Sequence, residues 1–317
     1  MDKLEIITKK INSASRIGIV THINPDGDAI GSTLALWRVL SIIGKKCDAL
    51  CDSPIPKMYA DCPFVEAFDE KKCESYDLMI SVDVSDPARC GCYLPLFERG
   101  EHISIDHHAG RVAFAKINYV EMTSSSAELI FKLLDKSYPE YITKEVAELL
   151  YIGLLTDCGG FAFEYVNSNS LYTASRLLSF GIDNSTLYRK YLKDRPLSQV
   201  KMAAYSISNA VYECGGRLAF LVFDNVILEK FGCDMSETSD CLQDLMRARE
   251  IDVGVSLTEI KKNVFKVSIR TKGSDYDASE IAREFGGGGH KNASGCQISG
   301  SLGVVLDRIT FAVSKVI

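Results

Sequence analysis

The sequence lacks long apolar runs, and its cysteines lack the paired spacing of zinc-binding modules. Runs such as residues 149–155 fall far short of the roughly 18 residues that a membrane helix needs. No apolar stretch follows Met1-Asp2-Lys3, so we expect neither a signal peptide nor contact with a membrane. The 11 cysteines include no C-x-x-C pair. Reduced thiols in a cytoplasmic protein are therefore the simple expectation.

The composition is that of an ordinary globular protein. The chain has 317 residues, of which 46% are hydrophobic and 25% charged, which excludes a disordered or fibrous protein. This length predicts two domains. The net charge of −6 argues against binding of long nucleic acid, but a small anionic substrate remains compatible with a local inversion of charge.

The first half of the chain alternates strand-like and helix-like segments. Strands are expected at residues 16–20, 46–51, 77–82 and 102–105. Helices are expected at residues 29–43, which end at Gly44, at residues 125–134, which open on a capping-box pattern, and at residues 144–155. Such alternation predicts an α/β fold with a parallel sheet.

After about residue 183 the pattern changes to a smaller α/β unit. Residues 187–207 look helical apart from Pro196. Strands are expected at residues 217–223, 253–258 and 264–271, and helices at residues 239–249 and after Asp277. We therefore expect a catalytic domain over residues 1–186, a helical connector over 187–208 and a second domain over 209–317.

The segment His22-Ile23-Asn24-Pro25-Asp26-Gly27-Asp28 directly follows the first expected strand. Pro25 and Gly27 disfavour a helix, so we expect His22, Asp26 and Asp28 on a loop at the carboxyl end of that strand, where open α/β sheets bind ligands. One imidazole and two carboxylates can ligate a divalent cation. Taken alone, the segment fits a polar loop that caps the next helix equally well.

Further acids and imidazoles stand at the ends of other elements. Asp83 ends one expected strand, Asp106-His107-His108 ends another, and Asp157 ends a helix. Parallel strand ends meet at one edge, where several carboxylates would repel one another unless cations neutralised them. The sequence therefore predicts two divalent ions, about 3.5–4 Å apart and bridged by one carboxylate.

Four consecutive glycines, residues 286–289, precede His290 and Lys291. We expect neither a helix nor a strand interior there, because glycine is entropically costly in both. A flexible linker is the alternative, but successive N–H groups of such a run can also cradle a phosphate. A basic stretch without any acid lies nearby and comprises Lys261, Lys262, Lys266, Arg270 and Lys272.

The ordered motifs together resemble the DHH phosphoesterase family. These motifs are His22-x-x-Pro25-Asp26-x-Asp28-Ala29-x-Gly31-Ser32, Asp83, Asp106-His107-His108 and Thr156-Asp157. The run from Gly286 to Gly295 resembles the DHHA1 domain of that family. The likeness spans nearly the whole chain and is greatest to small bacterial members that degrade very short RNA and dephosphorylate 3′-phosphoadenosine 5′-phosphate.

The resemblance implies a division of roles. His22, Asp26 and Asp83 would hold one ion, and Asp28, Asp83, His107 and Asp157 would hold the other, with manganese as the expected metal. His108 would face the substrate phosphate, Asp106 would orient the imidazoles, and a water activated by the metals would attack phosphorus in line. The expected clamp for the rest of the substrate comprises Arg270, Gly287, Gly288, Gly289 and His290.

The expected substrates are short RNA or DNA oligonucleotides, linear dinucleotides such as linear diadenylate, and nucleotide bisphosphates. A phosphatase or pyrophosphatase for small phosphates is one alternative, and a catalytically idle nucleotide-binding regulator is another. Cys158-Gly159-Gly160 departs from the family pattern after Thr156-Asp157, which puts nearby substrate contacts in doubt. The sequence leaves formation of a homo-oligomer open.

Overall fold

The computed structural model describes residues 2–69, 72–108, 113–273 and 275–317. The chain divides into two compact units, Met1–Asp194 and Arg195–Ile317. This division falls inside the expected connector. Among the described residues, no helix is both long and apolar enough to span a membrane.

The first unit is built on a five-stranded sheet in which every neighbouring pair is parallel. Its strands, in the spatial order β2-β1-β3-β4-β5, are β2 (Lys46–Leu50), β1 (Arg16–Val20), β3 (Leu78–Val82), β4 (Glu101–Asp106) and β5 (Ile117–Val120). The helices of this unit are α1 (Lys3–Ser13), α2 (Gly27–Ile42), α3 (Leu94–Glu98), α4 (Ser126–Ser137), α5 (Lys144–Asp157), α6 (Ser168–Leu178) and α7 (Asn184–Tyr188). The expected α/β fold with a parallel sheet is confirmed.

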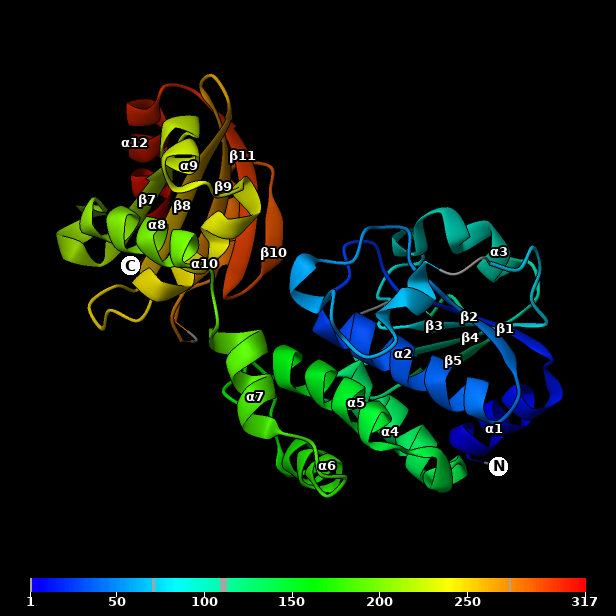
Figure 1. Ribbon diagram of the computed structural model, residues 1–317. Coiled ribbons are helices and arrows are strands. Elements are labelled where there is room, and N and C mark those ends of the chain that lie inside the picture. The colour runs from blue at the N-terminus through cyan, green and yellow to red at the C-terminus, as the bar shows by residue number, and fades with distance from the viewer. Residues whose placement is uncertain (1, 70–71, 109–112, 274) are drawn as a thin grey trace. The chain divides into compact units, whose positions relative to one another are not determined.

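Apolar side chains cover both faces of this sheet. Ile17, Ile19 and Ile80 pack with α1, α2, α4 and α5 in the larger core. Val20 and Met79 pack with Phe97 of α3 on the other face, and Figure 1 shows α3 on the opposite side of the sheet from α2. Because both faces are covered, a ligand can reach this sheet at the ends of its strands.

Two glycines allow α2 and α5 to approach each other closely. A Cβ atom on Gly31 would lie 2.3 Å from the carbonyl oxygen of Leu149, and one on Gly153 would lie 2.8 Å from Oδ1 of Asp28. Neither position could therefore hold a larger residue without moving a helix. This packing places the carboxyl end of α5 beside the amino end of α2.

The second unit contains a six-stranded mixed sheet. Its strands, in the order β10-β11-β9-β8-β7-β6, are β10 (Gly288–His290), β11 (Ala293–Ser299), β9 (Val264–Thr271), β8 (Val253–Lys261), β7 (Leu218–Phe223) and β6 (Val211–Glu213). The helices are α8 (Leu197–Ser208), α9 (Asn225–Phe231), α10 (Thr238–Leu245), α11 (Ala278–Arg283) and α12 (Leu302–Val313). One core lies against α11 and α12 and a second against α8, α9 and α10. Figure 1 labels α8, α9, α10 and α12 beside this sheet.

Two local expectations were wrong. The helix α2 begins at Gly27, so Asp28 lies in its first turn rather than on a loop, and Asp26 is the N-cap whose Oδ1 accepts from the N–H groups of Asp28 and Ala29. The glycine run also forms an edge strand, since Gly288–His290 pair with β11. Gly289 has a φ of 144°, which glycine alone adopts readily, and this freedom lets the run pair as a strand.

The expected helix over residues 187–207 is interrupted. The helix α7 ends at Tyr188, a π-helical turn covers Arg189–Lys193, and α8 begins only after Pro196. The missing N–H and fixed φ of proline explain the restart, because proline is accepted at a helix beginning but not in its interior.

Candidate metal centre

The carboxyl edge of the first sheet gathers the side chains that the sequence singled out. His22 follows β1, Asp83 follows β3, and His107 and His108 follow Asp106 at the end of β4. The remaining carboxylates come from the beginning of α2 and the end of α5. Three strands and two helices therefore contribute to one centre.

The first group joins His22, Asp26 and Asp83, whose ligand atoms all lie within 4.8 Å of one another. Nε2 of His22 is 3.8 Å from Oδ2 of Asp26 and 3.5 Å from Oδ2 of Asp83. The Asp26 side chain is 60% exposed, whereas those of His22 and Asp83 are 3% and 2% exposed. A cation bound here would remain in contact with solvent through Asp26.

The second group joins Asp28, His107 and Asp157. Nε2 of His107 is 3.3 Å from Oδ2 of Asp157 and 4.0 Å from Oδ2 of Asp28. Asp83 lies next to this group as well, because its Oδ1 is 3.6 Å from the same nitrogen. A third group of possible ligands consists of Asp83, His107 and His108.

Hydrogen bonds orient the imidazole rings of these groups. Nδ1 of His107 lies 3.1 Å from the carbonyl oxygen of Thr123, which can only accept, so Nδ1 carries a proton and Nε2 is the atom that would face a cation. Nδ1 of His108 donates in the same way to Oδ1 of Asp106 at 2.8 Å, and Asp106 is fully buried. This contact is compatible with the expected role of Asp106 in orienting an imidazole, which stays a prediction.

His22 has two competing partners at Nδ1. The carbonyl oxygen of Ile23 and Nη2 of Arg89 are each 2.9 Å from this atom. A guanidinium only donates and a carbonyl only accepts, so the ring satisfies one of them at a time. Ligation through Nε2 requires the proton on Nδ1, and that tautomer donates to Ile23. Arg89, in the short 3-10 helix Pro87–Tyr93, is a basic residue at the centre that sequence reasoning missed, because a lone arginine carries no pattern.

The segment before and at the start of α4 holds two of the carboxylates. The N–H groups of Ser126 and Ala127 donate to Asp28 at 2.6 and 2.9 Å, and Oγ of Ser126 donates to Oδ1 of Asp83 at 2.9 Å. The sequence suggested only a capping box here. Ser125 does cap α4, but Glu128 hydrogen-bonds the hydroxyl of Ser124 instead of closing the box.

Burial and neighbouring acids raise the pKa values of two of these carboxyl groups, whereas neighbouring histidines lower that of the third. Burial, and then the charges of Asp83, Asp157 and Asp26, raise the pKa of Asp28 well above its usual value. Burial and the charges of Asp83 and Asp26 raise the pKa of Asp157 to about 7, against the attraction of His107. Burial also opposes ionisation of Asp83, but the hydrogen bond with His22 and the neighbouring histidines outweigh it and lower its pKa to about 2.

These groups fit divalent cations. Oδ2 of Asp157 is buried and has no hydrogen-bond donor of acceptable geometry among the described residues, although His107 lies 3.3 Å away. A buried carboxylate oxygen without a donor is costly, and a cation would satisfy it. Asp83 also has a φ of 62°, in the left-handed region that a non-glycine residue adopts at a cost and that is often found at functional sites.

The second unit places the other expected substrate residues close together. His290 pairs with Ala293, which pairs with Arg270 across β10, β11 and β9. Burial lowers the pKa of the Arg270 guanidinium, and within the described part of the chain no carboxylate lies within ion-pair distance of it. The side chain of His290 and residue 274 lie outside what the structure describes.

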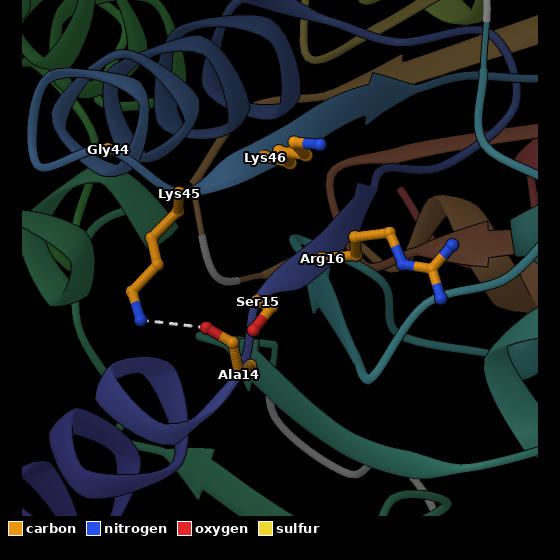
Figure 2. A pocket seen from close by; sticks show the side chains of 6 residues that line it. All are labelled: Ala14, Ser15, Arg16, Gly44, Lys45 and Lys46. Carbon is orange, nitrogen blue, oxygen red and sulfur yellow. Dashed lines mark hydrogen bonds between the residues drawn. The ribbon is translucent and has the colours of Figure 1, made fainter.

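A separate basic pocket lies at the opposite edge of the first sheet. Its cavity of about 440 Å³ is lined by Ala14, Ser15, Arg16, Gly44, Lys45 and Lys46. Figure 2 shows Lys45 donating to the carbonyl oxygen of Ala14, and the same ammonium also donates to Asn12. This pocket contains none of the groups of the metal centre, and we assign it no ligand.

Comparison with known proteins places this geometry in a wider context. Residues 16–154 match the family described as "DHH family, N-terminal domain", and residues 218–316 match the "DHHA1 domain". The bifunctional oligoribonuclease and PAP phosphatase NrnA of Thermus thermophilus is 30% identical, over 99% of this chain and 94% of that protein.

Two solved structures are also similar. An exopolyphosphatase-related protein from Bacteroides fragilis is 28% identical, with a TM-score of 0.90 over 99% of this chain and 96% of that one. The RecJ protein of Thermus thermophilus, solved in complex with Mn²⁺, is 16% identical, with a TM-score of 0.56 over 98% of this chain and 54% of that one. At that identity, RecJ supports the fold alone.

The fold and the acid-and-imidazole centre define a metal-dependent phosphoesterase. The chain belongs to the DHH family, with a DHH domain followed by a DHHA1 domain. The division of ligands between two ions, like the roles of His108 and Arg270, stays a prediction.

Proposed function

We propose that this protein hydrolyses very short oligonucleotides to mononucleotides and removes the 3′-phosphate of 3′-phosphoadenosine 5′-phosphate. The observation that carries the proposal is the convergence of His22, Asp28, Asp83, His107 and Asp157 at one sheet edge. The full-length likeness to an oligoribonuclease and PAP phosphatase supports the choice of substrate.

The protein would hold two divalent ions, with manganese the expected metal. The ligands of the first ion would be His22, Asp26 and Asp83. The ligands of the second would be Asp28, Asp83, His107 and Asp157. Asp83 belongs to the first group and lies within 3.6 Å of a ligand atom of the second, which suits it to bridge the two ions. Bound ions of this kind supply a water of lowered pKa and neutralise charge on phosphoryl oxygens.

The residues of the chain would prepare the substrate for this attack. His108 is 32% exposed, and the hydrogen bond to Asp106 raises its pKa to about 9 in the metal-free chain, which favours the protonated ring. A cationic imidazole in this position would bind a phosphoryl oxygen and stabilise the charge that develops on it. Arg270 and the glycine strand β10 would bind a second group of the substrate, since guanidinium and successive N–H groups both suit phosphate.

The cysteines favour a reducing, cytoplasmic location. All 11 lie within the described residues and all are free thiols. We assign them no part in the reaction.

The direct test is hydrolysis by the manganese-loaded chain. RNA and DNA of two to five nucleotides, 3′-phosphoadenosine 5′-phosphate and linear diadenylate would be compared by release of mononucleotide or phosphate. We expect turnover of the short substrates, loss of turnover after chelation, and recovery with Mn²⁺. Asp83→Asn should abolish both metal binding and turnover, whereas Asp183→Asn, at the N-cap of α7, should change neither.

A second outcome of the same experiment concerns inorganic substrates. The Bacteroides fragilis protein is named for a relationship to exopolyphosphatases, so pyrophosphate and polyphosphate belong in the panel. Hydrolysis of these compounds with none of the nucleotides would contradict the proposal and favour a small-phosphate phosphatase.

A further inference from the structure

The segment after Asp157 places two half-exposed aromatic rings beside the metal centre. Phe163 is 51% exposed and Tyr165 is 49% exposed. Their ring centroids lie 5.8 Å apart with an interplanar angle of 56°. The hydroxyl of Tyr165 donates to the backbone carbonyl of Asp157 at 2.8 Å, which fixes one ring next to a candidate ligand.

The backbone after α5 turns back on itself and hydrogen-bonds to the last residues of that helix. Gly159, Gly160 and Phe161 have successive φ values of 54°, 69° and 68°. The phenylalanine is costly there, because its Cβ atom crowds the backbone in the left-handed region. The turn brings the N–H groups of Ala162 and Phe163 to the carbonyl of Cys158, at 3.1 and 3.3 Å. The position of Phe163 is therefore fixed by hydrogen bonds rather than by burial of its ring.

The ring of Phe163 contacts the segment through its tip. A Cβ atom on Gly159 would lie 2.5 Å from Cζ and 2.8 Å from each Cε atom of this ring. Phe163 is nevertheless 51% exposed, so about half of its surface is open to solvent. A half-exposed aromatic ring near the candidate metal centre is suited to stacking on a planar group.

We propose that Phe163 and Tyr165 form the subsite for the nucleobase of the nucleotide whose phosphate is hydrolysed, an inference that rests on the proposed function. A nucleotide presents its base one sugar away from the phosphate, and every base has a π face that stacks on aromatic side chains. Inorganic polyphosphate has no such face. These rings would therefore select nucleotides over inorganic phosphates while tolerating any base.

The test compares Phe163→Leu, which keeps an apolar side chain but removes the π face, with Phe163→Tyr, which keeps it. The substrates are an RNA dinucleotide and its analogue that lacks the base next to the scissile phosphate. We expect Phe163→Leu to raise KM for the dinucleotide roughly 5- to 100-fold and to leave kcat nearly unchanged. The abasic analogue should be hydrolysed equally by both variants and the wild type, and Phe163→Tyr should behave as wild type.

Tyr172→Ala is the matched control, because Tyr172 is 58% exposed on α6 of the same unit and outside the metal centre. It should leave both substrates unaffected. An unchanged KM in Phe163→Leu, or an equal loss on both substrates, would overturn the subsite. A change in the oligomeric state of Phe163→Leu with unchanged KM would also overturn the subsite, because the rings would then contact a second copy of the chain.

Binding without turnover separates this inference from the proposed function. Titration calorimetry of the dinucleotide in the presence of a chelator measures affinity in the absence of hydrolysis. Weaker binding to Phe163→Leu than to the wild type supports the subsite, and equal binding overturns it. Failure of the wild type to hydrolyse any nucleotide in the presence of manganese would instead defeat the proposed function.

Discussion

Ser126 connects two of the candidate ligands through different atoms. Its N–H donates to Asp28 and its hydroxyl donates to Asp83. Groups that orient metal ligands typically contribute 10- to 100-fold to metal affinity. We predict that Ser126→Ala weakens Mn²⁺ binding roughly 10- to 100-fold in titration calorimetry, because Asp83 loses a donor while Asp28 keeps the N–H.

Ser124→Ala is the matched control for this variant. The Ser124 hydroxyl is equally buried but donates to Glu128 instead of a candidate ligand. Both variants should lose some stability, and only Ser126→Ala should lose metal affinity. Equal Mn²⁺ affinities for the two variants would show that Ser126 does not hold the centre.

Metal affinity should depend on pH through the carboxyl groups with raised pKa. Burial and neighbouring acids raise the pKa of Asp157 to about 7 in the metal-free chain. Below that pH a cation must displace a proton, so affinity should rise as pH increases from 6 to 8, by up to about tenfold per unit for each proton displaced.

The stability of the metal-free chain should follow the opposite course. The pKa of Asp157 is higher in the folded chain, about 7, than in the unfolded chain. The folded chain therefore holds this proton more tightly, and its free energy of unfolding should fall as the pH rises from the unfolded pKa through about 7. Urea titrations of metal-free protein at pH 5 and pH 8 measure this effect. A metal affinity that did not change with pH would contradict the assignment of Asp157 as a ligand.

The acids and imidazoles of the centre could be found from sequence, because each stands at a predicted strand or helix end. Ser126 and Arg89 could not. Ser126 carries the pattern of an ordinary helix cap, and its bond to Asp83 joins residues 43 positions apart. Arg89 lies 67 positions from His22. Only the sheet order β1-β3-β4 brings such residues together.

At the scale of helices and strands, the close approach of α2 and α5 positions Asp28 and Asp157. Gly31→Ala would place a Cβ atom 2.3 Å from a backbone carbonyl of α5. The gain in helix propensity is about 1 kcal/mol, whereas overpacking against backbone costs about 1–3 kcal/mol. We predict a net loss of stability in urea unfolding, accompanied by weaker metal binding.

Gly303→Ala supplies the comparison. Gly303 lies in α12, and a Cβ atom there would meet nothing within 4 Å. This variant should be neutral or more stable by up to about 1 kcal/mol. A stable Gly31→Ala variant with normal metal affinity would show that the spacing between α2 and α5 does not set the centre.

Several strands rich in β-branched residues were predictable, whereas other elements were missed, among them α1, α6 and β5. Helix α1 carries a capping box between Asp2 and Glu5, and α6 carries one between Asn167 and Ser170, so both had a signal in the sequence. Strand β5 had none, since Ile117–Val120 is short and pairs only with β4. Glycine disfavours strands, yet Gly288–His290 form the edge strand β10. Its hydrogen-bond partner β11 is a separate segment, so the local propensity of the glycines did not predict this strand.

At the scale of the whole molecule, the two units should respond differently to metal. The centre lies entirely within Met1–Asp194. A ligand at 100 times its dissociation constant adds about 2.7 kcal/mol of stability, which is about 5–10 °C in Tm for a unit of this size. We predict that Mn²⁺ raises only one of two calorimetric transitions, and an equal shift of both would contradict a centre confined to the first unit.

The central claim is that cations hold together carboxylates too crowded to coexist without them. Crystals grown with ample manganese and measured for anomalous scattering test it most directly. The account predicts two manganese peaks at the carboxyl edge of the first sheet, both bound by Asp83. A map with no peak there, and with Asp28, Asp83 and Asp157 pointing away from one another, would contradict it.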